Sequence, residues 1–228
     1  SGTGTVTLYF VDSAGNTTAL GTETVTFYGS ASKIEVTQNI GIVKYAGNVA
    51  GYTGTTPGAT DIAALAVAVT DSNGTTVAGL AGSLSCLSSD TTVIASCTVT
   101  ADDGAGAGTI GKNHYIVRVT SGANSTSGQS ADVTVRMIDP AGDGTTYLNG
   151  NKVTFKIAKS TVYTTTFTLD KTTYEPGEKA TLTVTMKDSS GNLVADTYSA
   201  ATVRGCVGSN AVASRSVQGS LPNTTDLC

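Results

Sequence analysis

The sequence is poor in the residue types that supply most enzyme chemistry and most surface charge. Its 228 residues include no tryptophan and one histidine, and only 13% are Asp, Glu, Lys or Arg, about half the usual share. The net charge of −4 at pH 7 gives no basic surface for nucleic acid. The longest apolar run, residues 62–69, is far too short to span a bilayer.

Catalytic motifs are equally scarce. A Ser-His-Asp triad could use only His114, and no nucleophile motif accompanies it. The glycine-rich segment 104–108 lacks the Lys-Ser/Thr pair of a phosphate-binding loop. We therefore expect a protein that is not an enzyme and that needs no cofactor.

Threonine, serine and glycine are abundant instead. Serine and threonine make up roughly a quarter of the chain, above their average use. In many segments apolar residues alternate with threonine or charged residues, which is typical of strands with one buried and one wet face. These segments are 5–11, 23–28, 33–37, 115–119, 132–137, 152–157, 166–169 and 181–186. The alanine-rich segment 64–70 is also interpreted as a strand, because its repeat counterpart alternates cleanly.

Two internal repeats indicate a module that occurs in tandem. Residues 6–15 match 133–142, and the strand that follows each copy also matches. In the second repeat, residues 65–74 match 182–191. The spacing predicts the closing hairpin of one module at 1–29, a complete module at 30–160 and the opening strands of a further module at 161–228. The predicted fold class is all-β, with tandem immunoglobulin-like β-sandwich modules.

One stretch also carries a family resemblance. Residues 169–184, with Tyr174-Glu175-Pro176-Gly177, and residues 187–194, with Asp188-Ser189-Ser190-Gly191, resemble the bacterial immunoglobulin-like domains of invasin- and intimin-type surface proteins. In that family the first turn leads into a core strand, and the second closes the next hairpin. The resemblance implies an exported structural or adhesive module, as found in surface layers, filaments and adhesins, and it implies no activity.

Three turns share aspartate in the first position and glycine in the fourth. They begin at Asp12, Asp71 and Asp188, and we interpret them as hairpin turns that the aspartate caps. A weaker hypothesis assigns calcium to two oxygen-rich loops, although neither completes a calcium-loop spacing. The candidate ligands are Asp139, Asp143, Asp102 and Asp103.

The four cysteines occupy equivalent places in the second repeat. Cys86 and Cys206 follow their turn aspartates at similar intervals, and each is followed by one more cysteine. The repeat predicts the disulfides Cys86–Cys97 and Cys206–Cys228 out of three possible pairings. Four buried thiols are the alternative.

Four possible N-glycosylation sequons are present, at Asn16, Asn73, Asn124 and Asn223. Because so many residues are serine or threonine, this number is close to the chance expectation and predicts no glycosylation by itself. Two of the sequons fall in hairpin turns, where a glycan could be attached.

These features favour a structural subunit of an extracellular cell-surface assembly that associates with itself into a lattice or filament. An adhesin stalk and an accessory module of a secreted hydrolase are the alternatives. Residues 161–228 could be completed by residues 1–29 of a second copy through strand donation. Against this, the composite would lack the stretch 98–132 of the central module, and a longer chain remains the other interpretation.

Overall fold

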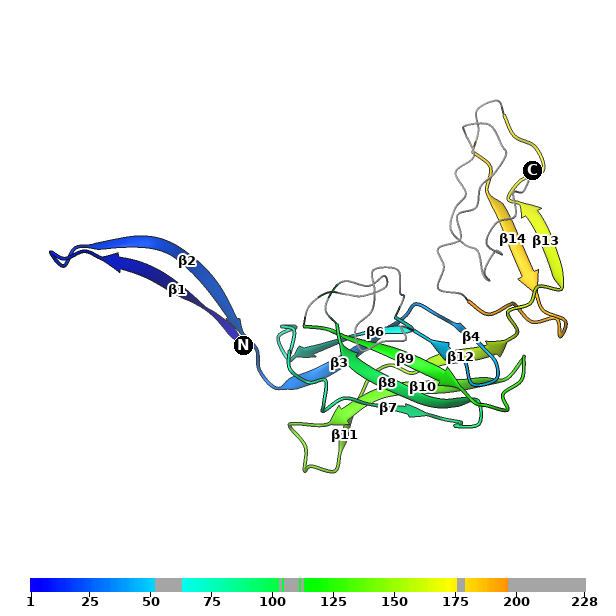
Figure 1. Ribbon diagram of the computed structural model, residues 1–228, viewed down its shortest axis with the longest axis horizontal. Helices are drawn as coiled ribbons and strands as arrows, with labels where there is room; N and C mark the ends of the chain where they lie inside the picture. Colours follow the sequence, from blue (N-terminus) through cyan, green and yellow to red (C-terminus); the bar gives the residue numbers. More distant parts are fainter. Residues whose placement is uncertain (52–62, 103, 105–110, 112, 176–178, 197–228) are drawn as a thin grey trace.

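The computed structural model describes residues 1–51, 63–102, 104, 111, 113–175 and 179–196. Every regular element in these residues is a β-strand. Figure 1 shows an extended N-terminal hairpin, a central sandwich and a C-terminal hairpin. The fold is all-β, as the alternating sequence pattern predicts. Among these residues no helix is long and apolar enough to cross a membrane.

The N-terminal hairpin is a two-stranded ribbon, formed by β1 (Gly2–Val11) and β2 (Thr17–Phe27). Gly2 lies opposite Phe27, Val11 lies opposite Thr17, and the register shifts once after Leu8. Asp12 caps the connecting turn through its Oδ1, which accepts from the N–H groups of Ala14 and Asn16.

The first sheet of the central sandwich has five strands. They are β3 (Ala31–Gln38), β5 (Val49–Ala50), β6 (Leu65–Asp71), β8 (Ile94–Ala101) and β9 (Tyr115–Ser121). The alanine-rich segment thus forms strand β6, as its repeat counterpart predicts. β6 pairs with both β3 and β9 and lies inside the sheet, so its early residues Leu65 and Ala66 are both buried although they point to opposite faces.

The second sheet also has five strands. They are β4 (Ile42–Lys44), β7 (Ser85–Ser88), β10 (Ser130–Ile138), β11 (Tyr147–Asn149) and β12 (Val153–Ala158). β4 runs parallel to β12, and β10 pairs with β7. The orders β3-β6-β9-β8 and β12-β10-β7 correspond to strands A-B-E-D and G-F-C of an immunoglobulin-type sandwich. Tandem repetition of such modules stays a prediction.

The core lies between the two sheets. Alternate residues of β6 and β9, such as Val67, Val69 and Val117, are fully buried. They belong to the same cluster as Val133 of β10 and Phe155 of β12. Within the sandwich, the apolar half of the alternating segments therefore forms this core, and the threonine-rich half faces outward.

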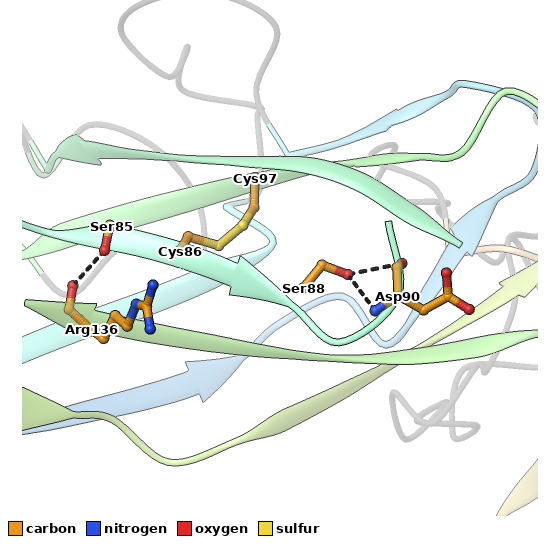
Figure 2. Close-up of a disulfide and its surroundings, with 6 residues drawn as sticks. All are labelled: Ser85, Cys86, Ser88, Asp90, Cys97 and Arg136. Atoms are coloured by element: carbon orange, nitrogen blue, oxygen red, sulfur yellow. Dashed lines mark hydrogen bonds between the residues drawn. A yellow bond between two sulfur atoms is a disulfide. The ribbon is translucent and has the colours of Figure 1, made fainter. Parts of the chain in front are cut away.

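The side chain of Tyr115 and a disulfide hold parts of the sandwich together. The buried hydroxyl of Tyr115 donates to the carbonyl of Val77 at 3.0 Å and accepts from the N–H of Leu80 at 2.9 Å. Burial raises the pKa of Tyr115. A disulfide joins Cys86 of β7 to Cys97 of β8 with 5.9 Å between their Cα atoms, and it links the two sheets (Figure 2).

The bonded cysteines form one of the two pairs that the repeat predicts. In antibody domains the inter-sheet disulfide joins strands B and F, whereas here it joins the strands in the C and D positions. Cys206 and Cys228 lie outside the described residues, so their pairing stays a prediction.

The C-terminal hairpin consists of β13 (Thr164–Leu169) and β14 (Leu182–Lys187). It reproduces the pairing of β3 with β6, since Thr165 lies opposite Met186 as Ile34 lies opposite Val69. The bridge of Lys187 to Leu193 likewise matches the bridge of Thr70 to Thr76. The residues that close the resemblance turn, 176–178, lie outside the described part of the chain.

Candidate functional site: two equivalent junctions

The first junction connects the N-terminal hairpin to the sandwich through Asp71, at the end of β6. One carboxylate oxygen, Oδ1, accepts from the N–H groups of Asn73 and Thr75, both at 2.9 Å, and so caps its own turn. The other, Oδ2, accepts from the N–H of Gly29 at 2.8 Å. Since Gly29 lies in the link between β2 and β3, one side chain fixes both the turn and the link.

Two further hydrogen bonds hold the base of the hairpin at this junction. The side-chain amide of Asn73 donates to Ser1 Oγ at 3.0 Å. The Tyr28 hydroxyl donates to the carbonyl of Ala78 at 3.2 Å. The first junction thus ties the start of β1 to the turn that begins at Asp71, and the end of β2 to the segment that follows this turn.

The second junction connects the sandwich to the C-terminal hairpin through Asp188, at the end of β14. Its Oδ1 accepts from the N–H groups of Ser190 and Asn192 at 2.8 and 3.1 Å. Its Oδ2 accepts from the N–H of Lys159, in the link between β12 and β13, at 3.1 Å. The Ser127 hydroxyl donates to the same oxygen and accepts from the side-chain amide of Asn192 at 2.9 Å.

The two junctions are built from the same parts. Asp188 occupies the place of Asp71, Lys159 that of Gly29, and Ser127, before β10, that of Ser1, before β1. The asparagine differs in its place within the turn, since it is the third residue of the first turn and the fifth of the second. The same hydrogen-bonding group is therefore kept although the turn sequences differ.

The second junction has an additional set of contacts. Asp196 Oδ2 accepts from the N–H groups of Gly41 and Ile42, both at 2.9 Å, and its own N–H donates to the carbonyl of Ile42. Ile42 also forms a small apolar cluster with Ala158 and Ala195. The segment after β14 is thereby held against the edge strand β4.

Both junction aspartates favour the charged form. The N–H of Gly29 is the largest cause that lowers the pKa of Asp71, to about 2, and the turn amides add to it against the opposing effect of desolvation. At Asp188 desolvation acts to raise the pKa, but the hydrogen bonds from Ser127, Lys159 and the turn outweigh it, so the pKa is lowered. At neutral pH both junctions therefore hold an ionised carboxylate, whose hydrogen bonds are the stronger kind.

Sequence reasoning assigned Asp71 and Asp188 to their turns only, and their role in the junctions was missed. Asp12 begins a turn of the same type, but its Oδ2 accepts from the side chain of Asn16 in that turn. The sequence signal that separates these cases is position, because Asp71 and Asp188 both lie at the end of the strand that pairs with the first strand after a link. The turn motif alone is the same in all three.

The calcium candidates occupy capped turns. Asp139 Oδ1 accepts from the N–H of Ala141, and Asp143 Oδ1 accepts from the N–H and hydroxyl groups of Thr145 and Thr146. Asp102 is buried and accepts from the N–H groups of Gly104 and Gly111. Asp103 lies outside the described residues. Within the described ranges no group of three or more His, Cys, Asp or Glu residues could hold a metal ion, and calcium binding stays an untested prediction.

The sequons have different surroundings. Asn16 and Asn124 are exposed, although the side-chain amide of Asn16 donates to Asp12. Asn73 is exposed as well, but its side-chain amide is the nitrogen that bonds Ser1 in the first junction. A glycan on that nitrogen would compete with the junction. Asn223 lies outside the described residues.

Known proteins resemble this chain only weakly. No family model matches the sequence, and no curated protein matches it. The crystal structure of the S-layer protein rSbsC(31-844) aligns with 85% of this chain at 17% identity and a TM-score of 0.37. The structure of surface layer protein SbsC, domains 1-6, aligns with 86% at 19% identity and a TM-score of 0.34. The chain spans about a quarter of the length of each, 24% in both cases.

Proposed function

We propose that this chain is a structural segment of an extracellular cell-surface assembly, a surface layer or filament, made of tandem immunoglobulin-like modules that associate with further copies. In this proposal the chain is not an enzyme. The observation that carries it is the repeated junction, in which an ionised aspartate ties each link to the unit that follows.

Neighbouring domains in one chain move relative to each other unless their interface is substantial. Here each link donates a backbone N–H to a carboxylate that is itself fixed by its own turn. Each junction also has an asparagine-to-serine hydrogen bond across it. Such links restrict bending, which suits a protein that must keep a regular spacing between its modules.

The surface and the disulfide also support the proposal. Few charged residues and many outward-facing threonines leave little repulsion between like subunits while offering many hydrogen-bonding groups. The bond between Cys86 and Cys97 favours an oxidising compartment, where disulfides persist.

The test is the location and state of the native protein. Antibodies against this chain should label intact cells over their surface, and material extracted from that surface should reassemble into a regular lattice or filaments under the electron microscope. Labelling confined to the cytoplasm would overturn the proposal. Surface protein that stays monomeric and binds a receptor or glycan would overturn it in favour of the adhesin stalk.

A further inference from the structure

The N-terminal hairpin has an exposed apolar side, which we term the hairpin face. In the β1–β2 register, residues that lie opposite each other point to the same side, and this places the apolar residues of the two strands together. The face consists of Val6, Leu8, Phe10, Val25 and Phe27, which are between 41% and 65% exposed. The other side carries threonine, including Thr7, Thr22 and Thr24, and near the turn it also carries the exposed residues Tyr9 and Val11. A contiguous apolar face of this kind marks an interaction surface.

The central sandwich of the same chain contains a second copy of this apolar pattern, and there it is covered by other strands. By the first repeat, Val6, Leu8 and Phe10 correspond to residues of β10, and Val25 and Phe27 correspond to residues of β12. The corresponding residues are Val133, Val135, Met137, Val153 and Phe155, and every one of them is buried. They belong to one cluster with residues of β3 and β6. The sequence counterpart of the hairpin face is thus packed in a core that includes β3 and β6. The register of β1 with β2 differs by two residues from that of β10 with β12, so the correspondence holds for each strand by sequence and for the side to which its residues point.

A second surface of the β3–β6 type exists in the chain. The C-terminal hairpin has the same register as β3 and β6. On the corresponding side Val184 and Met186 are buried in a small cluster with Val194. The same side also carries Phe167, Leu169 and Leu182. These side chains are 52%, 54% and 41% exposed. We term them the C-terminal face. The N-terminal hairpin therefore exposes the apolar side whose counterpart is covered in the sandwich, and the C-terminal hairpin exposes the part of its apolar side that lies beyond Val184 and Met186.

Resting on the self-association in the proposed function, we propose that the hairpin face of one copy packs on the C-terminal face of a second copy. The two sheets would lie about 10 Å apart, as in other sandwiches. Because the contact joins two different surfaces, it is heterologous, and its repetition links copies head to tail into a closed ring or an open filament.

The sandwich also identifies residues that should meet across this contact. Asn151, just before β12, accepts from the N–H of Val36 at 2.6 Å and donates to its carbonyl at 2.8 Å. By the same correspondence Asn151 is replaced by Glu23 on the hairpin and Val36 by Phe167 on β13. Glu23 of one copy should therefore lie beside Phe167 of the next.

The test is inter-chain disulfide trapping in the full chain. Protein with Glu23→Cys is mixed with protein with Phe167→Cys under mild oxidation, and linked dimers are identified by non-reducing electrophoresis and peptide mapping. Thr24→Cys is the matched control, because it is adjacent in sequence and points to the threonine side. We expect a link from Glu23→Cys only. No link, or equal linking by both cysteines, would overturn the proposal.

A second measurement does not depend on new cysteines. Sedimentation should show self-association that Leu8→Lys weakens about tenfold, as for the loss of a central interface residue, whereas Thr7→Lys leaves it unchanged. Thermal unfolding of both variants should match that of the unchanged chain, since these residues lie outside the sandwich core. Equal weakening by both variants, or association that Leu8→Lys does not affect, would overturn the contact.

The two proposals fail separately. Regular surface labelling of cells without specific trapping would overturn this contact and leave the cell-surface role in place. Specific trapping of a protein that is found only in the cytoplasm would overturn the cell-surface role and leave the contact in place.

Discussion

At the scale of single residues, the aspartate carboxylate explains how one side chain serves two purposes. It has two oxygens, each able to accept more than one hydrogen bond. In Asp71 and Asp188 one oxygen caps the turn and the other accepts from a link. Asp12 uses its second oxygen within its own turn, so it provides a natural control for the junction role.

Asp71→Asn should release the link and keep the turn. The amide oxygen can still accept from Asn73 and Thr75, but the amide nitrogen cannot accept from the N–H of Gly29. Hydrogen–deuterium exchange at the Gly29 amide should accelerate by about tenfold, as expected for a lost bond to a charged group. Exchange measured by NMR checks this result, and Asp12→Asn should leave Gly29 unaffected. Equal acceleration in both variants would contradict the junction role.

Tyr115→Phe should destabilise the sandwich. It removes the buried hydroxyl that donates to the carbonyl of Val77 and accepts from the N–H of Leu80. Both backbone groups then lose a hydrogen-bond partner, and an unsatisfied buried group costs about 1–3 kcal/mol. Urea denaturation measures the free energy of unfolding. Tyr28→Phe, whose hydroxyl also donates to a backbone carbonyl but whose ring is exposed, should change it much less. Similar losses in both variants would argue against burial as the cause.

At the scale of elements, alternation in the sequence identified most of the long strands, because successive side chains of a strand point to opposite faces. The eight-residue strand β8 (Ile94–Ala101) was missed, since it contains few large apolar residues. The short strands β4, β5 and β11 could not be found in this way. They have two or three residues, too few to show a period, and their pairing depends on neighbours that are distant in sequence. The parallel pairing of β4 with β12 is such a case.

The disulfide acts at this scale because it ties β7 to β8 across the two sheets. Replacing both Cys86 and Cys97 with alanine should lower the free energy of unfolding by about 3 kcal/mol, since a short closed loop loses its constraint on the unfolded chain. Urea denaturation of this double variant, compared with the unchanged oxidised chain, gives the value. A difference near zero would show that the bond is dispensable for the sandwich.

At the scale of the whole molecule, the junctions determine how its parts are held and at which pH. A carboxyl group whose pKa is lowered in the folded state stabilises the fold at pH values above its ordinary pKa. This contribution is lost as the pH falls toward the pKa of the folded state. For Asp71 this stabilisation is lost between pH 3.8, its ordinary pKa, and about 2, its pKa in the folded protein. Asp188 has a pKa lowered in the same direction, so both junctions should loosen only in strong acid.

This pH dependence can be followed at the link itself. In an NMR titration the amide resonance of Gly29 should stay constant above pH 4 and shift with a midpoint well below 3.8, near 2, as the carboxylate of Asp71 becomes protonated. The transition should vanish in Asp71→Asn. A midpoint at or above 3.8 would mean that the junction does not stabilise the ionised form.

Local sequence patterns were enough to predict the all-β class, most of the long strands, the hairpin turns and the repeats. These follow from alternation, from aspartate and glycine at fixed turn positions and from self-similarity, which are all local in the chain. Only the tertiary structure decided that Cys86 and Cys97 link opposite sheets and that two of three similar turn aspartates bind links. It also decided that the hairpin face is exposed while its counterpart on β10 and β12 is buried. Those outcomes depend on which distant residues meet, and equivalent sequences can meet different neighbours.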